Sequence, residues 1–227
     1  MVLGPGDLQR HDRLAAARAA AEQSRLAVPS LILGGHNVDG GIADPDERVA
    51  ERAQREVLAA VEWALTLGAE VVLVPFFLAA DLPDAAALDR CAAAFEALCP
   101  AAALAGVTLC FEGSLAAADI IRIADRADSD AFGCYFDPAN LVVAGLDPVA
   151  QAWALGSRIR RVHLKDTLER RGDCHLGEGR VDFEACAEAL DGIGYQDWLV
   201  LETPPGAPSD VRRDLNFARR LFPTLRR

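Results

Sequence analysis

The sequence lacks the features that would place the protein in or across a membrane. It shows no basic-then-apolar leader, and no apolar run approaches the ~18 residues that a spanning helix needs. It also lacks a CxxC motif, and its six cysteines stand in Ala-rich or apolar settings, where a free thiol is a small hydrophobic group. These absences predict a reduced, cytoplasmic protein without a membrane partner.

Basic charge is scarce as well. The 23 Lys and Arg residues face 34 Asp and Glu residues, for a net charge of −11. Proteins that bind nucleic acid through its phosphates need a basic face, so we expect no nucleic-acid partner. At 227 residues the chain fits one large domain or two small ones. No low-complexity linker divides it, and we predict a single domain over residues 1–227.

The chain does contain a regular alternation of apolar runs and helical patterns. Six solidly apolar runs predict strands that are buried on both faces, at residues 26–33, 70–77, 106–112, 132–137, 159–166 and 198–202. Helix-start residues and helical spacing predict helices at residues 7–24, 44–67, 83–105, 115–127, 147–155, 182–190 and 210–222. This order is typical of a parallel α/β sheet covered by helices.

Two parallel architectures fit this order, an eight-stranded barrel and an open doubly wound sheet that accepts six strands. Open sheets usually carry a Gly-rich phosphate turn after the first strand. Residues 34–41 follow the first predicted strand, but they do not fit GxGxxG. We interpret them as a mobile loop near the site, and residues 1–6 as a Gly/Pro-rich start with little to bury.

Four predicted strands end in a side chain that can bind a metal ion. These are Glu112, Asp137, His163 and Glu202, which lie 25, 26 and 39 positions apart. Each has a simpler interpretation, as a cap, a turn acid, a core histidine or a turn residue. However, the carboxyl ends of parallel barrel strands emerge on one face, so the four can converge. Three carboxylates and an imidazole suit one Mn²⁺ or Mg²⁺ ion, and Co²⁺ or Zn²⁺ would also fit.

Five short motifs surround these residues. They are TLCFEG (108–113), YFDPAN (135–140), VHLKD (162–166), LGEGRVDF (176–183) and WLVLE (198–202). In this order they resemble the xylose-isomerase-like TIM-barrel superfamily of sugar and sugar-phosphate isomerases and epimerases. The resemblance implies a (β/α)8 barrel in which Glu112, Asp137, His163 and Glu202 are the metal ligands. It also implies that Glu112 and Glu202 form the catalytic acid/base pair.

The activity implied is that of a metal-dependent isomerase or epimerase of a small sugar or sugar derivative. One Glu removes a proton beside a carbonyl, the metal stabilises the enediolate, and the other Glu returns the proton. A lyase of the inosose-dehydratase kind is an alternative, as is a catalytically weak partial barrel that acts through assembly. An endonuclease-IV-like phosphodiesterase needs more histidines than the four present, and the net charge of −11 argues against it.

Four further residues are predicted to bind the substrate. Asn140 stands where several family members carry a sugar-contacting His, and its amide can bind a hydroxyl but cannot carry a proton. Lys165 stabilises an oxyanion or, alternatively, pairs with Asp166. His36 ends the first predicted strand, and His175 lies in a loop before LGEG, where it touches substrate or is simply exposed.

Two departures from the family pattern qualify the resemblance. The ketose epimerases carry an Arg six residues beyond the ligand His, where this chain has Glu169 followed by Arg170 and Arg171. Family members also usually begin with two strands that have no counterpart here, so the sequence predicts strands three to eight of an incomplete barrel. Such a sheet has exposed apolar edges that a second copy of the chain could cover, which allows a homo-oligomer.

Overall fold

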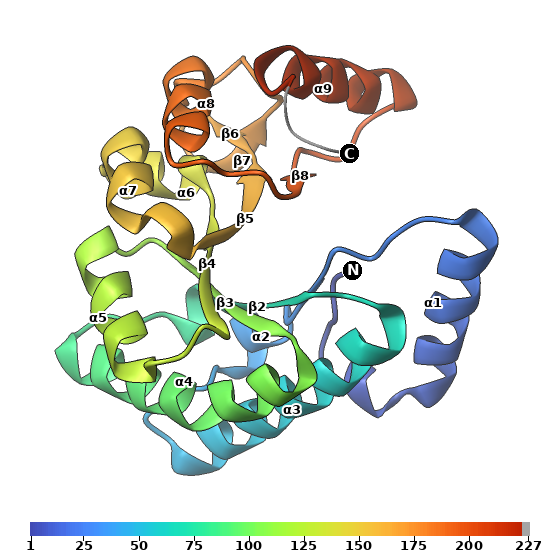
Figure 1. Cartoon of the computed structure of the whole chain (residues 1–227), viewed down its shortest axis with the longest axis vertical. Coiled ribbons are helices and arrows are strands. Elements are labelled where there is room, and N and C mark those ends of the chain that lie inside the picture. The colour runs from blue at the N-terminus through green and yellow to red at the C-terminus, as the bar shows by residue number, and fades with distance from the viewer. Residues whose placement is uncertain (224–227) are drawn as a thin grey trace. The chain divides into compact units, whose positions relative to one another are not determined.

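The computed structural model describes residues 1–223 of the chain, and Figure 1 shows its helices and strands. All six predicted strands are confirmed. They are β1 (Ser30–Ile32), β2 (Val71–Phe76), β3 (Thr108–Gly113), β4 (Phe132–Phe136), β5 (Ile159–Leu164) and β8 (Leu199–Leu201). They follow the order β1-β2-β3-β4-β5-β8, with parallel pairing of β1 with β2, β2 with β3, β4 with β5 and β5 with β8. The parallel α/β class that the sequence predicts is therefore correct.

The predicted helices are present as well. They are α1 (His11–Ser24), α3 (Glu47–Leu67), α4 (Ala85–Ala105), α5 (Ala117–Ala127), α7 (Pro148–Leu155), α8 (Phe183–Gly192) and α9 (Pro208–Leu221). Within residues 1–223, no helix is long and apolar enough to cross a bilayer.

Several short elements were not predicted from the sequence. They are the 3-10 turns η1 (Asp7–Gln9), η2 (Leu78–Ala80) and η3 (Gly156–Arg158), the helices α2 (His36–Asp39) and α6 (Pro138–Val143), and the strands β6 (Asp166–Thr167) and β7 (Arg171–Cys174). The helices among them span three to six residues, which is less than two helical turns, and the two strands, DT and RGDC, contain no apolar run. Residues 34–41, interpreted above as a mobile loop, contain α2.

The chain divides into two compact units. Unit 1 comprises residues 1–113 and 119–133, and unit 2 comprises residues 114–118 and, within the described chain, residues 134–223. The division falls inside β4, and the assignment of residues 1–227 to a single domain stays a prediction.

Unit 1 is built around the fully buried strand β2. Helix α3 packs against β1 and β2, α4 packs against β3, and the two helices lie side by side (Figure 1). Asp46 caps α3 by accepting a hydrogen bond from the backbone N–H of Arg48 at 2.9 Å, and Asp84 caps α4 through the N–H of Ala87 at 2.8 Å. These caps explain why the helix starts were predicted well.

The prediction that residues 1–6 bury little is wrong. Val2 forms a parallel bridge with Ile32, and the backbone N–H of Leu3 donates to the carbonyl of Ile32 at 2.7 Å. The side chain of Leu3 is buried. The sheet thus extends beyond β1 by one short bridged segment. The sequence did not predict this segment, because three residues next to Gly and Pro are too few to show a strand pattern.

In unit 2, α7 packs on α8 and α8 packs on α9. Strands β6 and β7 form an antiparallel hairpin directly after β5, in which Asp166 pairs with Cys174 and Thr167 pairs with Arg171. The hairpin packs on α6. The segments that follow β4, β5 and β8 therefore belong to one compact unit, and these segments carry most of the predicted site.

Candidate metal centre

Three of the predicted metal ligands come together in unit 2. Asp137 follows β4, His163 lies in β5 and Glu202 follows β8. Each offers one ligand atom, and these atoms lie within 4.8 Å of one another. The Nδ1 atom of His163 is 3.1 Å from Oε2 of Glu202 and 3.9 Å from Oδ2 of Asp137. Two carboxylate oxygens and an imidazole nitrogen form a donor set that suits a divalent ion.

Asp137 has two functions because its two oxygens are used differently. Oδ1 caps helix α6 by accepting hydrogen bonds from the N–H groups of Ala139 at 2.9 Å and Asn140 at 3.1 Å. Oδ2 lies toward His163 and Lys165. The cap fixes the rotamer, so that Oδ2 is held in place for a cation. The two interpretations of Asp137 from the sequence, turn acid and ligand, are thus compatible.

His163 is held by the strands around it. Its side chain is only 2% exposed, and its ring lies against Tyr135 of β4, with 4.3 Å between the ring centroids. Pairing of β5 with β8 continues past the strand end, where the N–H of Glu202 donates to the carbonyl of Leu164 at 3.0 Å. The side chain of Glu202 is 49% exposed, far more than those of Asp137 and His163.

Lys165 shares the carboxylates of this centre. Its Nζ atom is 2.8 Å from Oδ2 of Asp137 and 2.7 Å from Oε2 of Glu202. Gly172 of the hairpin lies over its methylene groups, where a Cβ would be 3.5 Å from the lysine chain. The buried ammonium offsets the repulsion between the two carboxylates.

Asp166 organises the loop that follows the hairpin. Its Oδ2 accepts hydrogen bonds from the N–H groups of Gly177 at 2.9 Å and Gly179 at 2.8 Å, and its Oδ1 accepts from Val181 at 3.2 Å. A Cβ at Gly179 would overlap the Asp166 carboxylate, which explains the glycine in the LGEG motif. Asp166 thus holds the backbone of this loop in place.

The other predicted site residues lie in both units. Glu112 of β3 and His36 of α2 are buried in unit 1, and Nε2 of His36 is 3.1 Å from Oε2 of Glu56. This hydrogen bond is the main reason that the pKa of Glu56 is lowered. Asn140 of α6 is buried in unit 2, and His175 bonds Asp214 there. The metal roles of Glu112, Asp137, His163 and Glu202, the acid/base roles of the two Glu residues, and the substrate roles of Asn140, Lys165, His36 and His175 stay predictions.

The cysteines offer no nucleophile. All six are buried, as the apolar settings predicted. Burial raises the pKa of the Cys99 and Cys174 thiols to about 11, and that of Cys186 to about 12. Thiolates are therefore scarce near neutral pH.

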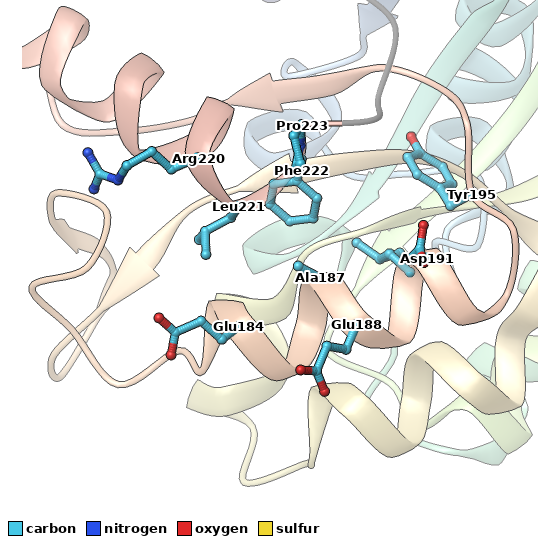
Figure 2. Close-up of a pocket in the computed structure, with 10 residues that line it drawn as sticks. Glu184, Ala187, Glu188, Asp191, Tyr195, Arg220, Leu221, Phe222 and Pro223 are labelled. Carbon is cyan, nitrogen blue, oxygen red and sulfur yellow. The ribbon is translucent and has the colours of Figure 1, made fainter.

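A separate groove lies between α8 and α9 in unit 2. It has a volume of about 370 Å³, and its wall contains none of the predicted site residues. Figure 2 shows Glu184, Glu188 and Asp191 on α8, with Arg220 and Phe222 at the end of α9. The hydroxyl of Tyr195 on its wall already donates to the carbonyl of Trp198 at 2.6 Å. Acidic side chains beside apolar ones do not form a catalytic site.

Comparison with known proteins decides the family. Residues 4–221 match the model of the family described as xylose isomerase-like TIM barrel. The chain belongs to this family. The resemblance that the five motifs predicted, and the TIM-barrel type of fold that it implied, are therefore confirmed.

The relatives of the chain include an epimerase and a dehydratase. It is 31% identical over 231 residues to 2-epi-5-epi-valiolone 7-phosphate 2-epimerase of Actinoplanes sp., a match that covers 97% of this chain and 79% of the epimerase. It is 29% identical over 103 residues to an inosose dehydratase of Lacticaseibacillus casei, with 37% of this chain and 35% of the dehydratase covered. The chain thus spans about a third of the length of that dehydratase.

Solved structures show the same fold. The structure of a D-tagatose 3-epimerase-like protein superposes with a TM-score of 0.83 over 98% of this chain and 86% of the other, at 18% identity. At that identity the likeness concerns the fold.

Proposed function

We propose that this protein is a divalent-metal-dependent isomerase or epimerase of a small sugar or sugar derivative. The proposal depends on one observation, the convergence of Asp137, His163 and Glu202 just past or within parallel strands of unit 2. In a chain of the xylose isomerase-like family, this is the end of the strands where active sites lie. The names of the relatives, an epimerase and a D-tagatose 3-epimerase-like protein, support the same class of reaction.

We propose Glu112 as the fourth ligand. It stands near the end of β3, it is buried, and it belongs to the TLCFEG motif that carries the family resemblance. A buried carboxylate is costly unless a cation or hydrogen bonds compensate it, and a divalent ion would do so. The oxygen-rich donor set favours Mn²⁺ or Mg²⁺ over softer ions.

Each side chain of the site has its own proposed role in the reaction. A divalent ion held here would polarise a substrate carbonyl and stabilise the negative charge that develops beside it. Glu202, half exposed, removes the proton from the neighbouring carbon, and Glu112 returns it. Lys165 donates a hydrogen bond to the developing oxyanion, while Asn140 and His36 bind substrate hydroxyl groups.

A second candidate is a lyase of the dehydratase kind. It is favoured by the identity to inosose dehydratase, although the match covers only 37% of this chain. The same proton abstraction would then be followed by loss of water, and an unsaturated product would distinguish the lyase from an isomerase.

Titration calorimetry with Mn²⁺, Mg²⁺, Co²⁺ and Zn²⁺ tests the metal centre. We expect one ion per chain, with the affinity reduced at least 100-fold in His163→Ala and Glu202→Gln, because loss of a ligand should exceed the 10- to 100-fold cost of losing its supporting groups. Glu184→Gln, which removes an exposed carboxylate of α8, is the matched control. Absence of binding, or equal affinity in all variants, would refute the centre.

Hydrogen exchange tests the reaction. With D-tagatose and D-fructose in deuterated water, the metal-loaded protein should incorporate deuterium beside the carbonyl. Glu202→Gln should lower this rate by 10²- to 10⁴-fold, the usual contribution of an acid/base group. A folded, metal-loaded protein that exchanges no proton in any of a panel of ketoses would instead support a non-catalytic partial barrel.

A further inference from the structure

Three arginines lie around Thr167, in the hairpin and the loop that follow β5. Arg171 is the partner of Thr167 in the β6–β7 ladder. The hydroxyl of Thr167 donates to the backbone carbonyl of Arg170 at 2.8 Å, and the carbonyl of Thr167 accepts from the backbone N–H of Arg180 at 2.9 Å. The backbones of the three arginines are therefore held close together, and all three residues are exposed.

The same hairpin lies against the lysine of the candidate centre. A Cβ at Gly172, the residue after Arg171, would be 3.5 Å from Cδ of Lys165. Nζ of Lys165 is 2.8 Å from Oδ2 of Asp137 and 2.7 Å from Oε2 of Glu202. The residue next to Arg171 is therefore in contact with a side chain that reaches two of the candidate ligands.

The guanidinium of Arg171 is held by a second segment of unit 2. Its Nη2 atom donates to the hydroxyl of Ser114 at 3.2 Å. Ser114 lies in residues 114–118, which belong to the same compact unit as the hairpin. A guanidinium carries five N–H donors, so it can bind a hydroxyl and an anion together. The contact with Ser114 orders a long side chain in advance, which lowers the entropy cost of binding a ligand.

Carboxylates near the arginines are mostly engaged by other groups. The acidic residues of the hairpin and its loop are Asp166, Glu169, Asp173 and Glu178. Backbone N–H groups bind the two aspartates, and Oε1 of Glu178 is 3.1 Å from Nη1 of Arg213. Within residues 1–223, neither Arg170 nor Arg180 forms an ion pair with Glu169 or another carboxylate. In a chain of net charge −11, the three arginines thus form a local positive site.

We propose that Arg170, Arg171 and Arg180 bind the phosphate group of a phosphorylated polyhydroxy ketone, and that the site therefore favours phosphorylated substrates. Guanidinium groups bind phosphate oxygens through paired, charge-assisted N–H bonds, and several together match its double charge. This role rests on the proposed function, because the carbonyl of the same substrate would lie at the candidate metal centre. The phosphate of such a substrate stands several bonds from its carbonyl, which suits arginines on a hairpin that folds back beside Lys165.

The first test measures binding without reaction. D-Glucitol 6-phosphate and D-glucitol lack a carbonyl, so calorimetry with the protein, with and without Mn²⁺, reports their affinity alone. We expect the phosphate ester to bind about 100-fold more tightly or better, because each charge-assisted hydrogen bond contributes about 10- to 100-fold. Equal affinities would overturn the proposal. Inorganic phosphate should compete with the ester but bind about tenfold more weakly, because it lacks the contacts of the polyol. Equal or tighter binding of inorganic phosphate would assign the arginines to free anions and overturn the substrate role.

The second test uses the single variants Arg170→Gln, Arg171→Gln and Arg180→Gln. The contacts of Thr167 with Arg170 and Arg180 use backbone atoms of these arginines, so the hairpin should stay folded, which thermal unfolding verifies. Each variant should lower the affinity for D-glucitol 6-phosphate about 10- to 100-fold. Arg219→Gln, at an exposed arginine of α9, is the matched control and should leave this affinity unchanged. Unchanged affinity in the three variants, or the same loss in Arg219→Gln, would overturn the proposal.

Deuterium exchange separates the phosphate site from the function on which it rests. D-Fructose 6-phosphate should exchange the proton beside its carbonyl with a kcat/KM about 100-fold above that of D-fructose, and the ratio should fall in each arginine variant. Exchange at equal kcat/KM for the two ketoses would overturn the phosphate site and leave the isomerase intact. Tight binding of D-glucitol 6-phosphate without exchange of either ketose would support the phosphate site and refute the isomerase.

Discussion

Strands β2 and β5 are both six residues long and lie in the same sheet, yet they differ in chemistry. Strand β2 has the sequence VVLVPF, and each of its side chains is buried. Strand β5 has the sequence IRRVHL and buries Arg161 and His163, and it continues into the buried residues Lys165 and Asp166. A strand that only packs is apolar throughout, whereas a strand that leads into a site carries ionisable groups to its end.

The two strands are also stabilised differently. In β2, Phe76 stacks on Phe111 with 4.6 Å between the ring centroids, and burial of apolar area supplies the free energy. In β5, Arg161 forms an ion pair with Asp197, and His163 lies beside Glu202. Buried charges cost free energy unless each is paired, so β5 depends on specific partners where β2 depends on packing.

The largest expected effect is loss of packing in β2. Leu73 is 0% exposed, and Leu73→Ala should lower the free energy of unfolding by about 3–4 kcal/mol, because a cavity is left behind. Metal affinity should not change, since Leu73 contributes no ligand atom. Urea unfolding and calorimetry measure the two quantities. The control is Leu104→Ala, at a side chain 93% exposed, which should cost less than about 0.5 kcal/mol. A loss below about 1 kcal/mol at Leu73 would contradict the assignment of β2 as core.

Removing the charge of Lys165, which follows β5, should have a smaller effect on stability. The size of this effect should depend on bound metal. Lys165→Met leaves the buried Asp137 without its ammonium, while the half-exposed Glu202 stays hydrated. We expect a loss of about 2–3 kcal/mol without metal, below the usual range for a fully buried pair. Mn²⁺ should bind more tightly to this variant, because Nζ no longer shares the two oxygens, and saturating Mn²⁺ should offset most of the loss. Urea unfolding with and without Mn²⁺ measures this difference. An undiminished loss in saturating Mn²⁺ would show that the lysine acts on packing alone.

The smallest effect concerns the hairpin that follows β5. The carboxylate of Asp173 accepts hydrogen bonds from the N–H groups of Leu168, Arg170 and Glu169, which lower its pKa from 3.8 to about 2. Because the folded pKa is depressed, this stabilisation is present above about pH 4 and is lost as the pH falls toward 2. Hydrogen exchange of these three amides, corrected for the intrinsic rate, should show decreasing protection over that window. Asp173→Asn should abolish this pH dependence, and its persistence in the variant would assign it to another group.

The long elements could be predicted because the helices show a regular spacing of apolar residues and the strands are continuous apolar runs. Solid apolar runs predicted β2 and β3 to within two residues, and Asp84 predicted the start of α4. Prediction failed for the short elements outside the six-stranded sheet, which depend on tertiary contacts and show no sequence pattern. Leu3 is buried only because residues 1–3 lie against β1, and the β6–β7 hairpin depends on the pairing of Asp166 with Cys174.

The sequence by itself determined the six strands of the parallel sheet and which chemical groups stand at their ends. Asp137, His163 and Glu202 could be named in advance because parallel strands bring their carboxyl ends to one edge. Only the tertiary structure decided how each group is used. It assigned one oxygen of Asp137 to the helix cap and the other to the centre, and it paired His175 with Asp214, 39 positions away. Such pairings depend on side-chain rotamers and on the packing of α9. Both follow from contacts between residues that are distant in the sequence, and a local sequence pattern does not show such contacts.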